Sequence, residues 1–239
     1  MLEVLLAIFV CLSLCAIRII KPDTDQLLCK DTTTQVRGIA ILGILFAHVI
    51  NNVYFLRMPS GHPVKYIFGV FAPLGVAVFL FLSGYGNTFS FNKNRQLTNL
   101  VKKCIKLYIP FGIVLIAFFF VCKSIGLNSV FPQSYSFITD FITLYIPPFT
   151  FWYLQVQLLA YITLFVFYRL SKKYYDIPLT LFWTCFVLFC IITSKQCCWY
   201  VSTLCFPLGC IFAKYYNRAN SKIAKTLATV RGYIYIGIV

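Results

Sequence analysis

The chain of 239 residues is 60% hydrophobic and only 11% charged, compared with about 25% charged residues in water-soluble domains. This composition excludes a soluble domain and predicts an integral membrane protein. The formal net charge of +15 would also fit a protein that binds nucleic acid, and the distribution of the basic residues decides between these two explanations.

Seven apolar runs are each long enough to cross about 30 Å of hydrocarbon as a helix. They lie near residues 2–20, 37–56, 66–91, 105–122, 151–168, 177–194 and 199–213. Their length and uniform apolar character are typical of helices and not of barrel strands. The sequence therefore predicts an all-α, polytopic transmembrane helical bundle that forms a single membrane domain over residues 1–239.

The two ends of the chain differ from the rest. The run over residues 1–20 has Glu3 where a secretory signal has a basic residue, and its basic residues Arg18 and Lys21 follow the apolar part. It is therefore predicted to be an uncleaved N-terminal anchor helix. An eighth run begins at Gly232 and has only eight residues, which indicates a truncated span over residues 232–239.

The basic residues are concentrated in alternate connections between the apolar runs. The segments 18–37, 93–106, 169–173 and 214–231 hold 17 of the 21 lysines and arginines. This is the positive-inside pattern, which places these segments in the cytosol and the N-terminus outside the cell membrane. The topology of the chain in the lipid bilayer therefore accounts for the net charge, and no nucleic-acid partner is predicted.

Most of the eleven cysteines lie inside the apolar runs, where a cysteine behaves as a small hydrophobic residue. Cys197 and Cys198 are the exception, because they lie in a short loop between two runs. No cysteine or histidine spacing is typical of a metal site. We therefore expect no bound metal.

The segment "VRGIAILGILFAHVINN" carries an arginine at its start and a histidine near its middle, Arg37 and His48. Eleven positions correspond to about 20° beyond three full helical turns and to about 16 Å along the axis, so both residues share one helix face. Ile41, Ile44 and then Asn51 or Asn52 continue that stripe.

Titratable groups inside a membrane are costly and mark functional sites. Two simpler interpretations stay open: Arg37 anchors the helix at lipid phosphates, and His48 is a packing residue that bonds to a neighbouring carbonyl. All six acidic residues lie at run ends or in loops, which disfavours an ion-coupled transporter. An imidazole can still act as a general base, which favours group-transfer chemistry.

These features resemble the acyltransferase-3 family of membrane-bound O-acyltransferases, which modify surface polysaccharides. The segment "VRGIAILGILFAHVI" is similar to the family's signature of an arginine and a histidine, here Arg37 and His48. The segment "VFLFLSGYG" is similar to a family pattern that contains a serine, here Ser83. In "VKKCIKLYIP", Lys103 and Lys106 stand where the family has two arginines, although lysine cannot grip a phosphate with two parallel hydrogen bonds as arginine does.

The resemblance covers about residues 30–213. It implies transfer of an acyl group, commonly acetyl, from cytosolic acetyl-CoA or another acyl-CoA to a hydroxyl of a cell-surface or exported glycan. The catalytic residues would be His48, as the general base of this reaction, and Arg37. Arg37, at the cytosolic N-terminus of its helix, would contact the donor together with a set of residues from the other two motifs, Ser83, Lys103 and Lys106. For Ser83, close helix packing is an alternative role, and for the two lysines, setting the membrane topology is another.

The glycan acceptor is expected at the outer ends of the helices. Residues of the right chemistry there are Asn51, Asn52, Trp152 and Gln155. Trp152 also fits an interfacial aromatic belt, and Gln155 and Gln157 fit hydrogen bonds between helices. Two other functions stay open: a subunit of a glycan or lipid transporter, and a truncated relative without catalytic activity.

Overall fold

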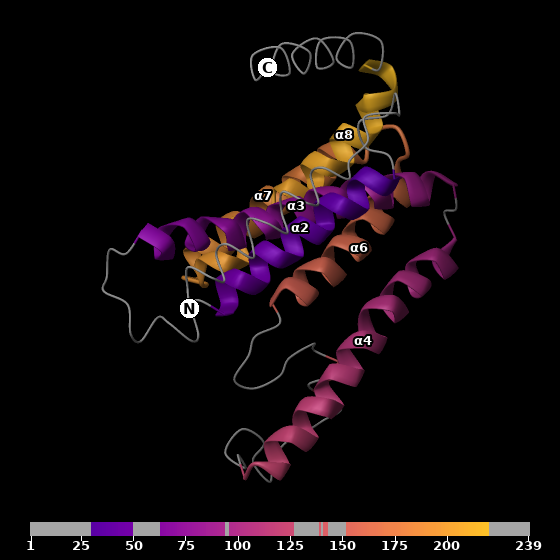
Figure 1. Ribbon diagram of the computed structural model, residues 1–239. Coiled ribbons are helices and arrows are strands. Elements are labelled where there is room, and N and C mark those ends of the chain that lie inside the picture. Colours follow the sequence, from indigo (N-terminus) through magenta and orange to yellow (C-terminus); the bar gives the residue numbers. More distant parts are fainter. Residues whose placement is uncertain are drawn as a thin grey trace. The chain divides into compact units, whose positions relative to one another are not determined.

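The computed structural model describes residues 30–49, 63–93, 96–126, 139, 141–142 and 152–219. These residues form six long helices and one short 3-10 helix (Figure 1): α2 (Lys30–Val49), α3 (Pro63–Lys93), α4 (Leu97–Ser124), α6 (Trp152–Leu170), α7 (Asp176–Ile192), η2 (Cys197–Trp199) and α8 (Cys205–Ala219). Since the described residues contain no strand, the all-α fold class is confirmed for this part of the chain.

Three stretches of the described helices are long and apolar enough to cross a membrane: Ala72–Lys93 within α3, Leu97–Ser124 and Trp152–Leu170. Helix α7 and the Cys205–Tyr215 part of α8 are apolar but shorter. The protein therefore has the helices of a membrane protein, while the total of seven spans stays a prediction. The runs at 2–20 and 232–239 lie outside the described residues.

Helix α2 begins earlier than the apolar pattern predicts. It starts at Lys30, because residues 30–36 contain no proline or glycine that would end the helix before Arg37. Arg37 therefore lies about 10 Å along the axis from Lys30, inside the helix. This corrects the expectation that Arg37 lies at the N-terminus of its helix.

The described chain belongs to two compact units. The first contains residues 1–85 and 208–239, and the second contains residues 86–207. The division falls inside α3 and inside α8, so each of these helices contributes to both units.

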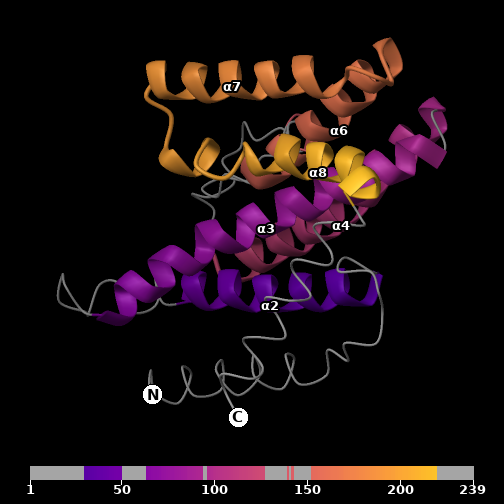
Figure 2. The ribbon, with the colours of Figure 1, turned by 90° about the horizontal axis from the view of Figure 1, so that it is seen from above.

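In the first unit, α3 lies between α2 and α8 (Figure 2). A Cβ atom at Gly75 of α3 would lie 2.7 Å from Cγ1 of Ile44 on α2. A Cβ atom at Gly209 of α8 would lie 2.0 Å from the carbonyl oxygen of Phe81 on α3. Both distances are shorter than any normal contact, so α2 and α8 approach α3 this closely only because glycine has no side chain.

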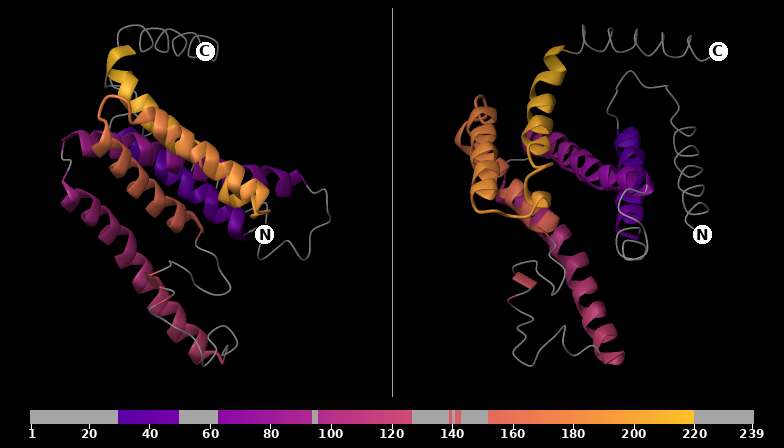
Figure 3. Two further views of the ribbon diagram at one scale, coloured as in Figure 1. Left: turned by 180° about the vertical axis from the view of Figure 1, so that it is seen from behind. Right: turned by 90° about the vertical axis from the view of Figure 1, so that its left-hand side faces the viewer.

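In the second unit, α4 packs on α6, and α6 and α7 form a hairpin through the short connection 171–175 (Figure 3). The contact of α4 with α6 is centred on Phe111 and Leu115 of α4, which pack against Leu154 and Leu158 of α6. The contact between α4 and α6 is therefore made by apolar side chains.

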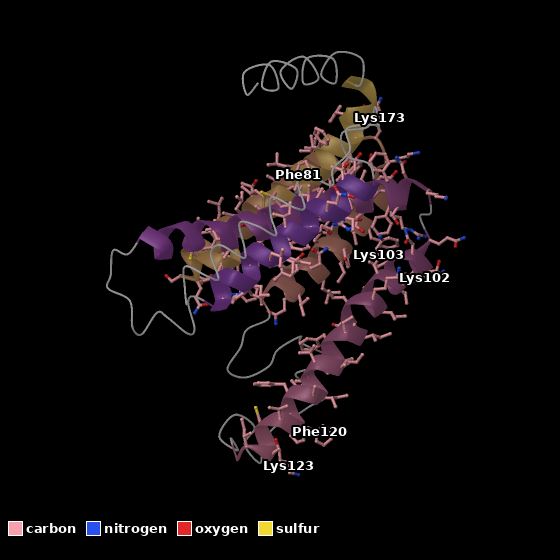
Figure 4. All side chains as sticks on the ribbon, in the orientation of Figure 1. Phe81, Lys102, Lys103, Phe120, Lys123 and Lys173 are labelled. Atoms are coloured by element: carbon pink, nitrogen blue, oxygen red, sulfur yellow. The ribbon has the colours of Figure 1, made fainter. Side chains whose placement is uncertain are left out.

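Much of α4 presents apolar side chains outward. Ile113 is 63% exposed and Phe120 is 64% exposed, and Figure 4 shows Phe120 near the C-terminal end of the helix. Exposed apolar side chains of this size are unfavourable in water, but they suit a helix that is surrounded by lipid.

Candidate functional site

Arg37 connects two helices of the first unit. Its side chain is half-buried, and its Nη2 atom donates a hydrogen bond to the backbone carbonyl oxygen of Leu82 on α3 at 3.4 Å. Ala40 and Ala47 of α2 are buried, and such small side chains let two helices approach closely. Arg37 therefore lies beside the packed face of α2, with its charged group directed at α3.

His48 lies on the same continuous helix, in its last turn, and its side chain is exposed. Ile44 lies between Arg37 and His48 along the helix axis and is half-buried, while Ile41 on the outer face is 53% exposed. The stripe that holds both residues thus runs along the border between the packed and the exposed faces. This gives the imidazole of His48 access to its surroundings, as a general base requires. Asn51 and Asn52, assigned to the same stripe, lie outside the described residues.

Ser83 of α3 is half-buried. The residue before it, Leu82, accepts the hydrogen bond of Arg37. The residue after it, Gly84, accepts a hydrogen bond from Sγ of Cys210 on α8 at 3.5 Å. Contacts to both neighbouring helices therefore fix the backbone on each side of Ser83.

Lys103 and Lys106, which carry the basic motif, have different surroundings in the second unit. The Nζ atom of Lys103 donates a hydrogen bond to Oδ1 of Asn87 at 2.6 Å and lies 5.5 Å from the centre of the Phe91 ring. Lys103 is half-buried, whereas Lys106 and its neighbour Lys102 are exposed. The structure thus holds the first lysine of the motif against α3 and leaves the second at the surface.

The α3 and α4 helices are joined by a further pair of polar residues. Nδ2 of Asn99 donates to the hydroxyl of Ser90 at 3.1 Å and to the Ser90 carbonyl at 3.3 Å. Because Asn99 and Lys103 are four residues apart, they lie on one face of α4 and make successive contacts with α3. The start of α4 is therefore fixed to the end of α3.

Two basic segments lie at the same end of the second unit. The hydroxyl of Tyr168, at the end of α6, donates to Oδ1 of Asn92 at the end of α3. This bond brings the segment 169–173 to the end of the unit that holds the segment 93–106. In Figure 4, Lys102 and Lys103 lie at one end of α4 and Lys123 lies at the other.

The two residues expected at the acceptor side lie near the start of α6. Trp152 and Gln155 are both half-buried, and the Trp152 ring packs edge-to-face on Tyr153 with 6.1 Å between ring centres. Gln157 is buried and accepts a hydrogen bond from the Tyr153 hydroxyl at 3.3 Å. Gln157 therefore has a hydrogen bond within its own helix.

The motif residues thus divide between the units: Arg37, His48 and Ser83 belong to the first, and Lys103 and Lys106 belong to the second. A family model described as an acyltransferase domain, that of the acyltransferase-3 family, matches residues 34–239. The chain belongs to the acyltransferase-3 family. The resemblance seen in the sequence motifs is thereby confirmed, and it identifies a membrane acyltransferase. No curated protein and no solved structure matches the chain.

Sequence reasoning alone missed two residues of this acyltransferase that contact Lys103. Both are buried: Asn87 is 6% exposed and Phe91 is 1% exposed. A signal was present, because an asparagine in an apolar run is unfavourable in a membrane unless it has a partner. The sequence could not identify Lys103 as that partner, since the pairing depends on how α3 and α4 pack.

Proposed function

We propose that this protein is a membrane-embedded O-acyltransferase. It transfers an acyl group, in the first instance acetyl, from cytosolic acyl-CoA to a hydroxyl of a cell-surface or exported glycan. One structural observation supports this most: the Arg37 guanidinium bonds to the turn of α3 that precedes Ser83, while the exposed His48 follows on the same helix as Arg37. Three residues from two family motifs thus belong to one compact unit.

In this proposal, His48 is the general base. Its imidazole takes the proton of the acceptor hydroxyl as the hydroxyl oxygen attacks the thioester carbonyl carbon. A new carbon–oxygen bond forms, the carbon–sulfur bond breaks, and the CoA thiolate leaves and receives a proton. The hydroxyl of Ser83 donates a hydrogen bond to the negative charge that develops on the carbonyl oxygen.

Arg37, Lys103 and Lys106 bind the acyl-CoA donor. CoA carries several phosphate charges, and arginine and lysine are the side chains that bind phosphate in proteins. For Lys103 and Lys106, support comes from their place at the end of the second unit that also holds the basic segment 169–173. Arg37 has further N–H donors besides the one it directs at Leu82.

The glycan acceptor is recognised by residues at the outer ends of the helices. Trp152 offers an aromatic face to a sugar ring, and Gln155 offers both a donor and an acceptor to sugar hydroxyls. Asn51 and Asn52 have the same hydrogen-bonding character as Gln155.

The orientation follows from the charge pattern. The segments 93–106 and 169–173 face the cytosol, and the N-terminus lies outside the cell membrane. The bond between Tyr168 and Asn92 brings these two segments to one end of the second unit. A single orientation of this unit in the membrane therefore allows both basic segments to face the cytosol.

The proposed function is tested by transfer of labelled acetyl from acetyl-CoA to extracted surface glycan, in membranes that contain the native protein or the variants His48→Ala and Arg37→Ala. We expect label in the glycan with the native chain and its loss in the His48 variant, with equal amounts of both proteins in the membrane. If the native chain gave no label in glycan above that of membranes lacking the protein, the proposal would be wrong.

A further inference from the structure

Lys103 is held in place by two side chains of α3. Its ammonium group donates to the Asn87 amide oxygen at 2.6 Å and lies over the Phe91 ring at 5.5 Å. Asn87 and Phe91 are four residues apart, so they lie next to each other on one face of α3. Both are buried, which means that they have fixed positions before any ligand arrives.

A lysine side chain in solution loses conformational entropy when it is fixed in one conformation. The hydrogen bond to Asn87 and the contact with the Phe91 ring already provide this ordering in the free protein. An ammonium group has three N–H donors, and Asn87 takes one of them. The other two N–H donors of Lys103 therefore belong to an ammonium group whose position is already fixed.

The partner of Lys103 is neutral. An amide oxygen orders the ammonium group but does not cancel its charge, whereas a carboxylate would do both. The second unit has two acidic residues in its sequence, Asp140 and Asp176; Asp176 is buried and Asp140 lies outside the described residues. A carboxylate at position 87 would accept the same hydrogen bond from Lys103 and would cancel its charge.

We propose that Asn87 and Phe91 are positioning residues, which hold the ammonium group of Lys103 so that it can bind a phosphate group of acyl-CoA. This rests on the proposed function, in which Lys103 contacts the donor. Lys106, one turn further along α4 and exposed, supplies a second charge that is not positioned in this way. The two lysines of the motif then have different roles, because one is held in position and the other is exposed.

The test measures CoA binding to the purified full chain in detergent by titration calorimetry, together with the melting temperature of each variant. Asn87→Leu removes the acceptor of the hydrogen bond. Asn87→Asp keeps an acceptor oxygen but neutralises Lys103. Ser90→Ala is the matched control, because it removes a neighbouring contact between α3 and α4 without changing the surroundings of Lys103.

We expect both Asn87 variants to bind CoA roughly tenfold more weakly, or about 1.4 kcal/mol, and Ser90→Ala to stay within about twofold of the native protein. We expect Asn87→Asp to keep a native-like melting temperature, because its carboxylate still accepts the hydrogen bond. Weaker CoA binding in a variant of unchanged stability is a result that a purely structural contact would not give.

Three other results would be informative. If Asn87→Asp bound CoA as tightly as the native protein, the positioning role would be wrong while the proposed function could stand. If the native protein bound CoA and the variants weakened binding but no acetyl transfer occurred, the positioning role would stand and the proposed function would fall. A native protein that bound no CoA would overturn the positioning role and the assigned donor.

Discussion

Arg37 on α2 and Leu82 on α3 are 45 positions apart in the sequence, yet the guanidinium Nη2 lies 3.4 Å from the Leu82 carbonyl oxygen. That carbonyl belongs to a helix, and a carbonyl oxygen has two lone pairs, so it can accept a second hydrogen bond. The contact therefore joins the helix of the arginine and histidine motif to the helix of the serine motif.

Replacing Arg37 by methionine keeps a long side chain but removes the charge and the donors. Hydrogen bonds between membrane helices contribute on average about 0.6 kcal/mol, so we expect Arg37→Met to lower the melting temperature by only a few degrees. We expect acetyl transfer to fall at least roughly tenfold, since a charged contact to the donor is lost. We expect the acetyl-transfer rate of Arg37→Lys to lie between those of the native protein and Arg37→Met. Native-rate transfer by Arg37→Met would contradict a donor-binding role.

His48→Gln removes the proton acceptor but leaves a polar side chain of similar size. Loss of a general base typically slows a reaction by roughly 10²–10⁴-fold, and we expect a decrease in that range in the acetyl-transfer assay. Leu45→Ala is the control, because Leu45 is also exposed and lies one turn earlier on α2. A His48→Gln protein that keeps more than a tenth of native activity would exclude the general base role.

The positions of the longer helices were predictable because the bilayer sets their length. The runs at 66–91 and 151–168 correspond to helices at 63–93 and 152–170, a difference of a few residues at each end. Helix α4 begins at Leu97 and not near residue 105, because lysines favour helix formation without being apolar. Hydropathy finds the apolar part of a helix and misses the polar turns that extend it.

The family and its motif residues were also predictable, because a titratable residue stands out in an apolar run. The contacts of these residues were not. Lys103 and Asn87 are 16 positions apart, and their pairing depends on how the end of α3 turns into α4. Leu82 could not be identified either, since any residue can offer its backbone carbonyl to Arg37.

A side chain at Gly209 should separate α8 from α3. Its Cβ atom would lie 2.0 Å from the Phe81 carbonyl oxygen, and backbone atoms must move to relieve that contact. Forcing extra atoms into a packed contact costs about 1–3 kcal/mol, so we expect Gly209→Ala to lower the melting temperature in detergent by several degrees. Gly38→Ala is the control, with no atom within 4 Å of the new Cβ. Equal melting temperatures of the two variants would contradict the close contact.

Removing the charge of Lys106 should weaken donor binding without affecting the fold, because the side chain is exposed. We expect Lys106→Ala to raise the KM for acetyl-CoA by roughly threefold to tenfold at low salt, and less at high salt, where exposed charges are screened. Lys123→Ala removes a similar exposed charge from the other end of α4 (Figure 4) and should leave the KM unchanged. If both variants raised the KM equally, the effect would be one of net charge.

The proposed orientation places η2 outside the cell, and η2 contains adjacent thiols of different exposure. Cys197 is exposed and Cys198 is half-buried. Burial, and secondly the neighbouring Cys197, raise the pKa of the Cys198 thiol, so less of it is in the reactive thiolate form near neutral pH.

We therefore expect a membrane-impermeant maleimide to label Cys197 on intact cells, and Cys198 more slowly, with sites mapped by mass spectrometry. The difference should shrink as the pH rises, because Cys198 then loses its proton. A cysteine introduced by Lys172→Cys, in the connection between α6 and α7, should react only after permeabilisation. The reverse result, with position 172 labelled from outside and Cys197 protected, would invert the orientation and place the basic segments on the wrong side for a cytosolic donor.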